Sequence, residues 1–228
     1  MGALSLSVED QGFAILPGVF SSSEMQQLVE DLEHSGLRRS KAGVRHALKH
    51  PAVAALAEEP RLLSIAREIL GEKVCSFRAT LFDKSPQANW LVVWHQDTAL
   101  PLRERRDTPG WGPWSVKDGV AYAHAPADVL GGVLALRIHL DDSTAQNGPL
   151  RVLPATHRQG VVSDDAIEKI SAQIAAVDCL VPRGGVLVMK PLLIHASSKS
   201  QLEMPRRVLH IEYAEPSIVG ENLELAVA

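Results

Sequence analysis

The sequence predicts a mainly β protein, an antiparallel barrel or sandwich with a layer of N-terminal helices packed outside it. The first third of the chain has the apolar period of amphipathic helices. From Val74 onward, short apolar runs alternate with turn residues such as Asn147-Gly148 and Gly184-Gly185. One helical stretch, near 164–175, interrupts these runs. Strands without alternating helices indicate an antiparallel arrangement.

The helical layer is expected over about 21–71. A Ser21-x-x-Glu24 capping box begins a helix whose apolar stripe has four members: Met25, Leu28, Val29 and Leu32. Gly36 should end this helix. A second helical stretch, "AVAALAEEPRLLSIAREILG", is interrupted by Pro60 and ends at its final glycine.

The barrel is expected over about 74–215, from seven apolar runs: "VCSFRATLF", "WLVVWHQD", "GVLALRIHL", "PLRVLP", "GGVLVMK", "PLLIHAS" and "RRVLHIEYA". The segment 98–130 lies between the second and third runs and is too long for a simple hairpin. It contains Trp111 and Trp114, two of the four Trp residues. A lid over an organic substrate is favoured, and a surface loop or dimer contact is the alternative.

Length and composition limit the possible classes of protein. The 228 residues, 46% of them apolar, suit one domain over 1–228. A net charge of −4 with scattered Lys and Arg does not favour a nucleic-acid or anionic-membrane partner. No apolar run approaches the roughly 20 residues of a membrane span, and no signal peptide is visible. Cys75 and Cys179 should be reduced thiols, so a cytoplasmic location is expected.

The run "NWLVVWHQDTAL" ends an expected strand with His95, Gln96 and Asp97. Alternate strand side chains share a face, so His95 and Asp97 lie about 6.6 Å apart along the strand. An imidazole and a carboxylate at that spacing can converge on one metal ion. Short motifs also match by chance, so a structural His beside a solvated Asp is an alternative for this pair taken alone.

The C-terminal runs contain residues that could complete a metal site. A non-haem iron site of the facial-triad type needs a second His, and His195 ends the run "PLLIH". Ser197 shares its strand face, and Arg206 begins the next strand eleven positions after His195. A guanidinium there can pair with a dicarboxylate that also chelates the metal, and the Ser197 hydroxyl can add a hydrogen bond.

With these motifs the sequence resembles the phytanoyl-CoA dioxygenase family of iron(II)/2-oxoglutarate oxygenases. The resemblance covers most of the chain. Its motifs are "LFDKSP" leading into "WHQD", then "LDDSTAQNGPLRVLPATHRQG", "PRGGVLVMKPLLIHASS" and the Arg-Arg strand, with Ala155-Thr156 where Gly-Ser is usual. The resemblance implies a double-stranded β-helix (jelly roll or cupin-like barrel). It implies that iron(II) is bound by His95, Asp97 and His195, and 2-oxoglutarate by Arg206.

The resemblance also implies the chemistry: with O2, 2-oxoglutarate is converted to succinate and CO2 while an unactivated C–H bond of a small organic substrate is hydroxylated. Relatives that halogenate lack the carboxylate ligand, so the presence of Asp97 favours hydroxylation. A monomer or homodimer is expected. Two other readings stay open: a non-oxidative cupin-like isomerase or binding protein, and a zinc hydrolase, for which no separate general base is visible.

Several further assignments are less direct. Arg207 competes with Arg206, because Leu209, Ile211 and Tyr213 share the face of Arg207. Five other residues are candidates for contacts near the metal. Arg137 and Thr80 are candidate co-substrate contacts, with a structural ion pair as the alternative for Arg137; His139, Trp111 and Trp114 are candidate substrate contacts. Arg45 could reach the site from the helical layer or face solvent. Scaffold roles are expected for His46, His50, His124, His157 and His210.

Overall fold

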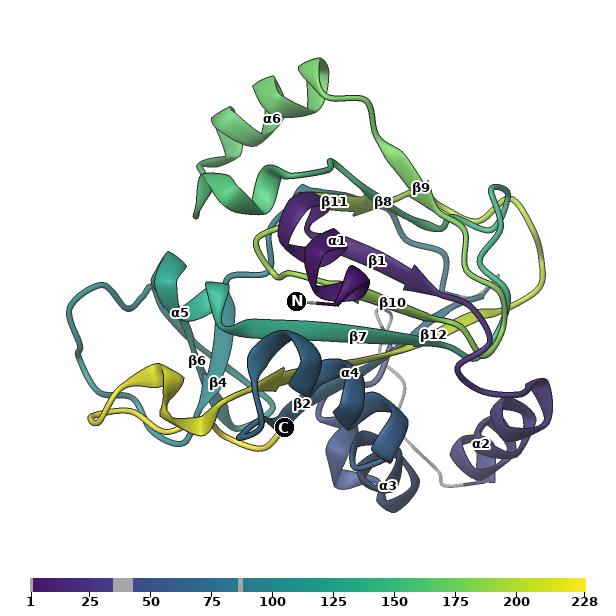
Figure 1. The fold of residues 1–228 in the computed structure, drawn as a ribbon, viewed down its shortest axis with the longest axis horizontal. Helices are drawn as coiled ribbons and strands as arrows, with labels where there is room; N and C mark the ends of the chain where they lie inside the picture. The colour runs from purple at the N-terminus through teal and green to yellow at the C-terminus, as the bar shows by residue number, and fades with distance from the viewer. Residues whose placement is uncertain (1, 35–42, 86–87) are drawn as a thin grey trace.

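The computed structural model describes residues 2–34, 43–85 and 88–228. Its largest element is a five-stranded antiparallel sheet (Figure 1). In spatial order its strands are β1 (Phe13–Leu16), β10 (Val186–Met189), β7 (Val133–His139), β12 (Arg206–Ala214) and β2 (Cys75–Lys84). The strand β1 was not expected from the sequence, and it pairs with β10 at one edge of the sheet.

A second antiparallel sheet lies across the inner face of the first. Its strand order is β3 (Val92–His95), β11 (His195–Ser197), β8 (Leu150–Val152) and β9 (Val177–Cys179). The apolar residues between the two sheets include Ala135, Leu150, Val152, Leu187 and Met189. The two facing sheets form the jelly-roll barrel that was predicted. Of the expected strand "PLLIHAS", only the last three residues pair as a strand.

The helical layer covers the outer face of the large sheet (Figure 1). It consists of α1 (Ala3–Gln11), α2 (Ser22–His34), η1 (Ala47–Lys49), α3 (Pro51–Ala57) and α4 (Pro60–Leu70). The predicted capping box is present, since the Ser21 amide donates to the Glu24 carboxylate (2.7 Å) and the Glu24 amide to Ser21 Oγ (3.3 Å). Pro60 begins α4 rather than interrupting one helix. Gly36, the expected end of the first helix, lies outside the described residues.

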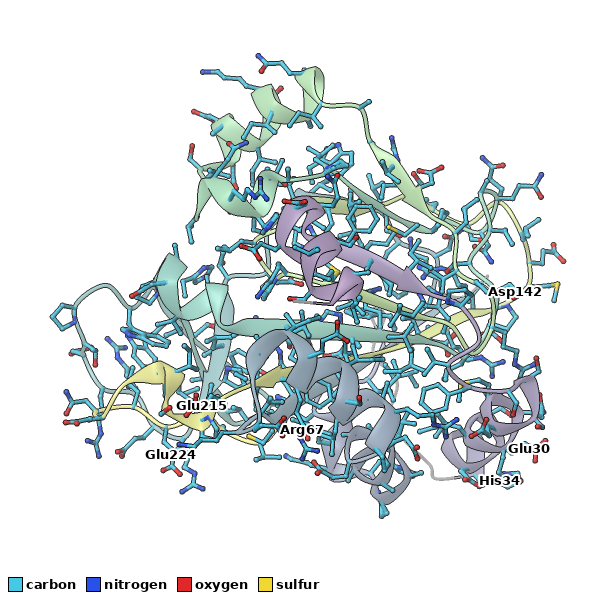
Figure 2. The ribbon with its side chains drawn as sticks, in the orientation of Figure 1. Glu30, His34, Arg67, Asp142, Glu215 and Glu224 are labelled. Carbon is cyan, nitrogen blue, oxygen red and sulfur yellow. The ribbon has the colours of Figure 1, made fainter. Side chains whose placement is uncertain are left out.

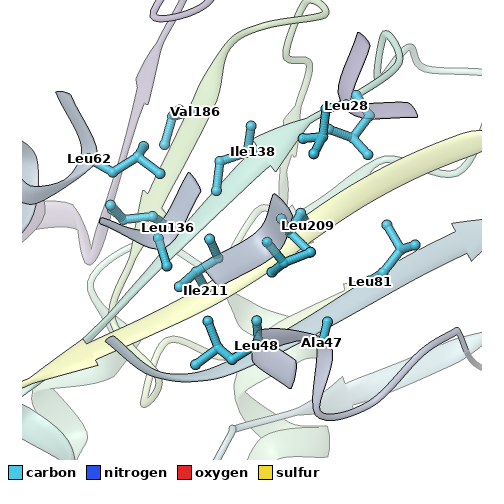
Figure 3. Close-up of a cluster of buried hydrophobic side chains, with 14 of the residues drawn as sticks. Leu28, Ala47, Leu48, Leu62, Leu81, Leu136, Ile138, Val186, Leu209 and Ile211 are labelled. Carbon is cyan, nitrogen blue, oxygen red and sulfur yellow. The ribbon is translucent and has the colours of Figure 1, made fainter. Parts of the chain in front are cut away.

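The main hydrophobic core lies between these helices and the large sheet (Figure 3). Leu136 and Ile138 of β7 and Leu209 and Ile211 of β12 point toward Leu62 of α4 and its neighbours, and all five are fully buried. Because strand side chains alternate between faces, the residues between them point into the barrel. On β2, β7 and β12 this inner face contains polar residues such as Lys84, Arg137 and Glu212.

The segment 98–130 is not a loop but a small sheet with a helix. Its strands are β4 (Ala99–Leu102), β5 (Trp114–Lys117) and β6 (Val120–His124), followed by α5 (Ala127–Gly131). The β5–β6 hairpin turns at Asp118-Gly119, where both residues have positive φ angles of 50° and 82°. An Asp-Gly pair between strands is a hairpin signal, so this turn could have been found in the sequence.

The remaining elements lie at the periphery: α6 (Asp164–Gln173), close to the expected 164–175, and the short helices η2 (Thr156–Gln159) and η3 (Pro216–Val219). None of the described helices is both long and apolar enough to span a bilayer. Charged side chains such as Arg67, Asp142 and Glu224 are exposed on the surface (Figure 2). Several charged residues inside the barrel, namely Lys84, Arg137, Arg206 and Glu212, are buried instead, and they border the candidate site.

Candidate active site

His95, Asp97 and His195 converge at one end of the four-stranded sheet. Strands β3 and β11 are antiparallel neighbours, and their register sets His195 directly opposite His95. The two imidazole rings have centroids 4.2 Å apart. Asp97, two residues after His95, is fixed where its amide donates to the carbonyl oxygen of Pro191 (3.0 Å). Its carboxylate oxygens lie 3.7 Å from His95 Nε2 and 3.5 Å from His195 Nε2.

Both imidazoles are oriented in the same way by the backbone. Nδ1 of His95 donates to the carbonyl oxygen of Val93, and Nδ1 of His195 donates to that of Leu193, each at 2.8 Å. In the neutral tautomer that these bonds select, Nε2 of each ring carries no hydrogen and is directed at Asp97, the arrangement of metal-binding histidines. Burial lowers the pKa of His195 to about 4, so this imidazole is neutral at neutral pH.

The donor set fits iron(II). Two neutral imidazoles and one carboxylate offer ligand atoms that all lie within 4.8 Å of one another. Burial favours the neutral form of Asp97, but the positive charges that the surrounding histidines can acquire and the charge of the Arg78 guanidinium outweigh it and lower the pKa of this carboxyl group. Two histidines and one carboxylate with open positions on one side form the facial triad of non-haem iron(II) oxygenases.

Gln96, between the two candidate ligands, points away from them and fixes the strand end. Its Nε2 donates to the carbonyl oxygens of Gly160 (2.8 Å) and Leu192 (2.7 Å), and its Oε1 accepts from the Val162 amide (3.0 Å). The alternation of strand side chains, which predicted a shared face for His95 and Asp97, also assigns Gln96 to the opposite face. Its positioning role was not predicted.

A cavity of about 80 Å³ adjoins the triad between the two sheets, and we call it the Arg206 cavity. Besides the triad and apolar residues, its wall contains Lys84, Trp90, Arg137, Ser197 and Arg206. Arg206, Ser197 and Arg137 were expected at a co-substrate site. Lys84 was not. It lies directly opposite Arg206 in the β2–β12 register.

The Arg206 cavity contains three buried cations. Within the described residues, neither Arg206 Nε nor Arg137 Nε has a hydrogen-bond partner. Lys84 Nζ donates to Ser197 Oγ (2.6 Å) and to the carbonyl oxygen of Ser198. Burial and the charges of Arg206 and Arg137 lower the pKa of Lys84 to about 7. Uncompensated positive charge beside a candidate metal site fits a ligand with a carboxylate, such as a 2-oxo dicarboxylate.

Arg207 lies on the other face of β12. Its guanidinium donates to Asp141 Oδ2 (2.8 Å) and Oδ1 (2.9 Å) and to Glu33 Oε1 (2.8 Å), beneath the helical layer. Arg207 thus has carboxylate partners within the protein, whereas Arg206 is 3% exposed and faces the cavity. The apolar face of β12, shared by Leu209 and Ile211, is the outer face.

A second cavity, of about 160 Å³, lies on the other side of Asp97 and Phe82, which border both cavities. We call it the Tyr122 cavity. It is lined by polar side chains from four parts of the chain, namely Arg45, Arg78, Lys117, Tyr122, His210 and Glu212. The segment 98–130 therefore reaches the site, through Lys117 and Tyr122.

Four predicted contacts lie elsewhere. Thr80 lines the Tyr122 cavity and not the Arg206 cavity. His139 is buried but lines neither. Trp111 and Trp114 pack on the apolar cluster under the small three-stranded sheet and border a separate surface hollow. Trp111 precedes β5, and Trp114 lies on the face of β5 opposite Lys117, which is the β5 residue that lines the Tyr122 cavity.

Among the five histidines with expected scaffold roles, four have hydrogen bonds. His46 Nε2 bonds Tyr122 Oη (3.0 Å), and His124 Nδ1 bonds Thr98 Oγ1 (2.7 Å). His157 Nε2 donates to the carbonyl oxygen of Glu9 (3.0 Å). His210 accepts from Arg137 Nη1 (2.9 Å), but it also lines the Tyr122 cavity. His50 Nδ1 has no partner among the described residues.

Comparison with known proteins gives relatives along most of the chain. An ectoine dioxygenase from Sphingopyxis alaskensis is 30% identical over 196 residues, covering 76% of this chain and 56% of that protein. One from Bordetella bronchiseptica is 28% identical over 170 residues, covering 67% and 48%. An L-proline trans-4-hydroxylase from Streptomyces griseoviridis is 25% identical over 186 residues, covering 70% and 62%. The chain spans about half the length of the ectoine dioxygenases it matches.

Solved structures share the fold. EctD from S. alaskensis, with 2-oxoglutarate and 5-hydroxyectoine, has a TM-score of 0.72 at 20% identity, covering 95% of this chain and 77% of that one. AviO1 from Streptomyces viridochromogenes has a TM-score of 0.69 at 24% identity, covering 94% and 95%. The family description "Phytanoyl-CoA dioxygenase (PhyH)" matches residues 8–208, nearly the whole jelly roll. The chain therefore belongs to the phytanoyl-CoA dioxygenase family.

Proposed function

We propose that this protein is an iron(II)/2-oxoglutarate-dependent hydroxylase of a small organic substrate. The observation that carries the proposal is the triad of His95, Asp97 and His195 beside a cavity whose cations lack a counter-charge. The family match and the ectoine dioxygenase and proline hydroxylase relatives support the same chemistry. A non-oxidative cupin-like function needs no carboxylate-binding cavity, so it is not favoured.

The triad residues would hold iron(II) through His95 Nε2, His195 Nε2 and the Asp97 carboxylate. Bound iron, 2-oxoglutarate and O2 would together supply the oxidising power for an unactivated C–H bond. Arg206 would bind the distal carboxylate of 2-oxoglutarate, with Lys84 and Ser197 beside it. Arg137 is held by His210 at the inner end of this cavity and adds positive charge there.

The substrate would occupy the Tyr122 cavity, with the C–H bond to be hydroxylated directed at the metal through the opening beside Asp97. Phe82 lies between the two cavities, since it lines both, and its ring contacts the Arg137 guanidinium of one (5.1 Å to the centroid) and His210 of the other (5.9 Å between centroids). The two organic ligands would therefore approach the metal from different directions. This separation positions both without mutual overlap.

The proposal is tested with protein purified without oxygen. It should bind about one iron(II) per chain, and added 2-oxoglutarate should produce a weak visible charge-transfer band, because its keto acid chelates the metal. A His95→Ala, His195→Ala double variant should lose both signals. Unchanged iron content in that variant, or iron binding with no response to 2-oxoglutarate, would refute the assignment.

A further inference from the structure

The Tyr122 cavity contains more positive than negative charge. Its cations are Arg45, Arg78 and Lys117, and its carboxylates are Glu212 and Asp97. Both oxygens of Glu212 accept hydrogen bonds from Arg78, so these two buried residues neutralise each other. Asp97 belongs to the metal site. Lys117 and Arg45 therefore remain without a negative partner.

Lys117 is directed into the cavity from the β5–β6 hairpin. Its Nζ lies 4.8 Å from the centroid of the Tyr122 ring. No described carboxylate lies within ion-pair distance of Lys117 or of Arg45, which is exposed at the cavity rim. Burial and the charges of Arg78 and Arg45 lower the pKa of Lys117. The Asp97 carboxylate acts in the opposite direction but is not within ion-pair distance, so this half-buried ammonium, packed on an aromatic ring, favours the binding of an anion.

We propose that the substrate is a small organic acid whose anionic group, a carboxylate or a phosphate ester, binds Lys117 with Arg45 at the rim. This inference rests on the proposed function and specifies its substrate class. The cavity of about 160 Å³ is close to the roughly 150 Å³ known to accommodate benzene, so about six carbon atoms fill the inner part. The carbon atoms farthest from the acid group then lie nearest Asp97 and the metal.

The same cavity selects against an ammonium group. Glu212 is 1% exposed and both of its oxygens are bonded to Arg78, so it offers no free carboxylate to an amine. With the Asp97 carboxylate bound to the metal, an amine or the ammonium of an amino acid would lie among Arg45, Arg78 and Lys117 and be repelled. Simple acids should therefore bind more tightly than matched amides, and amides more tightly than matched amines.

The test measures binding to the full chain loaded with iron(II) and 2-oxoglutarate under argon, so that the Arg206 cavity is filled. The probes are butyrate, valerate, cyclohexanecarboxylate and cyclohexyl phosphate, with butyramide, valeramide, cyclohexanecarboxamide, cyclohexanol and cyclohexylamine as neutral or cationic counterparts. Calorimetry should show at least one acid binding ten times or more tightly than its neutral counterpart. The carboxylate and phosphate members distinguish the two kinds of anionic group.

Lys117→Gln should weaken binding of that acid by tenfold or more and leave its neutral counterpart unchanged, since only a charge-assisted contact is lost. Lys169→Gln, an exposed lysine of α6, is the matched control and should have no effect. The inference is overturned if no acid exceeds its neutral counterpart, or if Lys117→Gln leaves the acid affinity unchanged.

Failure of the proposed function is recognised separately, because it would appear as lost iron or 2-oxoglutarate binding before any probe is added. Arg206→Ala checks whether an acid binds in the Tyr122 cavity or in the Arg206 cavity. In protein without 2-oxoglutarate, an acid bound at Lys117 keeps its affinity in this variant. An acid that instead loses its affinity with Arg206→Ala and keeps it with Lys117→Gln occupies the other cavity, which also overturns the inference.

Discussion

Asp97 is the residue on which both cavities and the triad meet. Its carboxylate lies within 3.7 Å of two imidazole nitrogens, and it borders the Arg206 and Tyr122 cavities alike. As a ligand it would complete the facial triad and offset one charge of iron(II) in a site of low dielectric. Changes at this residue separate metal binding from turnover.

We expect Asp97→Ala to bind iron more weakly and to lose hydroxylation, because His95 and His195 remain but the third ligand is gone. Asp97→Glu should also lose activity, since one methylene displaces the carboxylate oxygen by more than the roughly 0.5 Å tolerance of a catalytic constellation. Iron content and succinate release are measured for all three proteins in one assay. Wild-type turnover in Asp97→Ala would exclude Asp97 as a ligand.

Substitutions of the adjacent residues Arg206 and Arg207 should affect different properties, co-substrate binding and stability respectively. Arg206→Ala should weaken 2-oxoglutarate binding by on the order of 2–5 kcal/mol, the cost of losing a buried charge-assisted contact, with little change in iron affinity. Arg207→Ala should instead lower the free energy of unfolding, because Asp141 and Glu33 lose their partner. Calorimetric titration and urea unfolding distinguish the two. The opposite pattern would make Arg207 the anchor.

Lys84 should make 2-oxoglutarate binding depend on pH. Its pKa in the free protein is lowered from 10.5 to about 7, so the side chain is charged below pH 7 and increasingly neutral above it. A bound dicarboxylate favours the charged form, so binding takes up a proton above pH 7 and the Kd rises, by up to about tenfold per pH unit. Lys84→Met should bind more weakly at pH 6 and show a flatter profile between pH 6 and 9. An unchanged profile would contradict this role.

At the residue scale, the sequence was sufficient to name the three side chains that the structure brings together, and insufficient for the residues around them. The His-x-Asp spacing gave a shared strand face, and the family resemblance added His195 and Arg206. Lys84 and Glu212 could not be assigned, because their roles depend on which residues face them across β2 and β12. That register pairs Lys84 with Arg206 and Glu212 with Arg78, and it is a tertiary property that no local pattern in the sequence reveals.

At the element scale, strand alternation explains why β7 and β12 have one apolar and one polar face. Leu136 of β7 packs under the helices, while its neighbour Arg137 points into the barrel. Alternation was readable in the sequence, but which face is the inner one was not, since both are buried. The four-residue strand β1 was missed because it is too short for a clear period. The hairpin β5–β6 was missed although its Asp-Gly turn is a recognised signal.

Leu136→Ala tests whether the outer face of the large sheet contributes to stability and not to ligand binding. Leu136 is 0% exposed, so its truncation should lower the free energy of unfolding by about 2–5 kcal/mol through the cavity it leaves. Iron and 2-oxoglutarate binding by the folded protein should be unchanged, because the residue faces the helices. Leu180→Ala, at a 49% exposed side chain, is the control and should change stability by less than about 0.5 kcal/mol. Urea unfolding and iron titration measure the two effects.

At the scale of the whole molecule, three layers create the site: the helices, the five-stranded sheet and the four-stranded sheet. The three-stranded sheet lies at one end of them. The Arg206 cavity lies between the two barrel sheets, and the Tyr122 cavity lies where β5 and β6 approach β2 and β12. The barrel and its outer helices were predicted. The approach of the 98–130 segment to the site was expected too, but its cavity-facing residues could not be chosen without the β5–β6 register.

Both cavities are lined by residues of the paired strands β2 and β12. Along this pair, residues of the Tyr122 cavity come first and residues of the Arg206 cavity follow. Arg78 and Glu212 mark one end and Lys84 and Arg206 the other, six residues or roughly 20 Å of strand away. Evolution can therefore alter the end proposed to contact the substrate without altering the end proposed to contact the co-substrate. For enzyme engineering, a library could vary Lys117 alone and Arg78 and Glu212 as a pair, so that no buried charge is left unpaired. Such a library would test new substrates while the proposed metal and co-substrate residues stay unchanged.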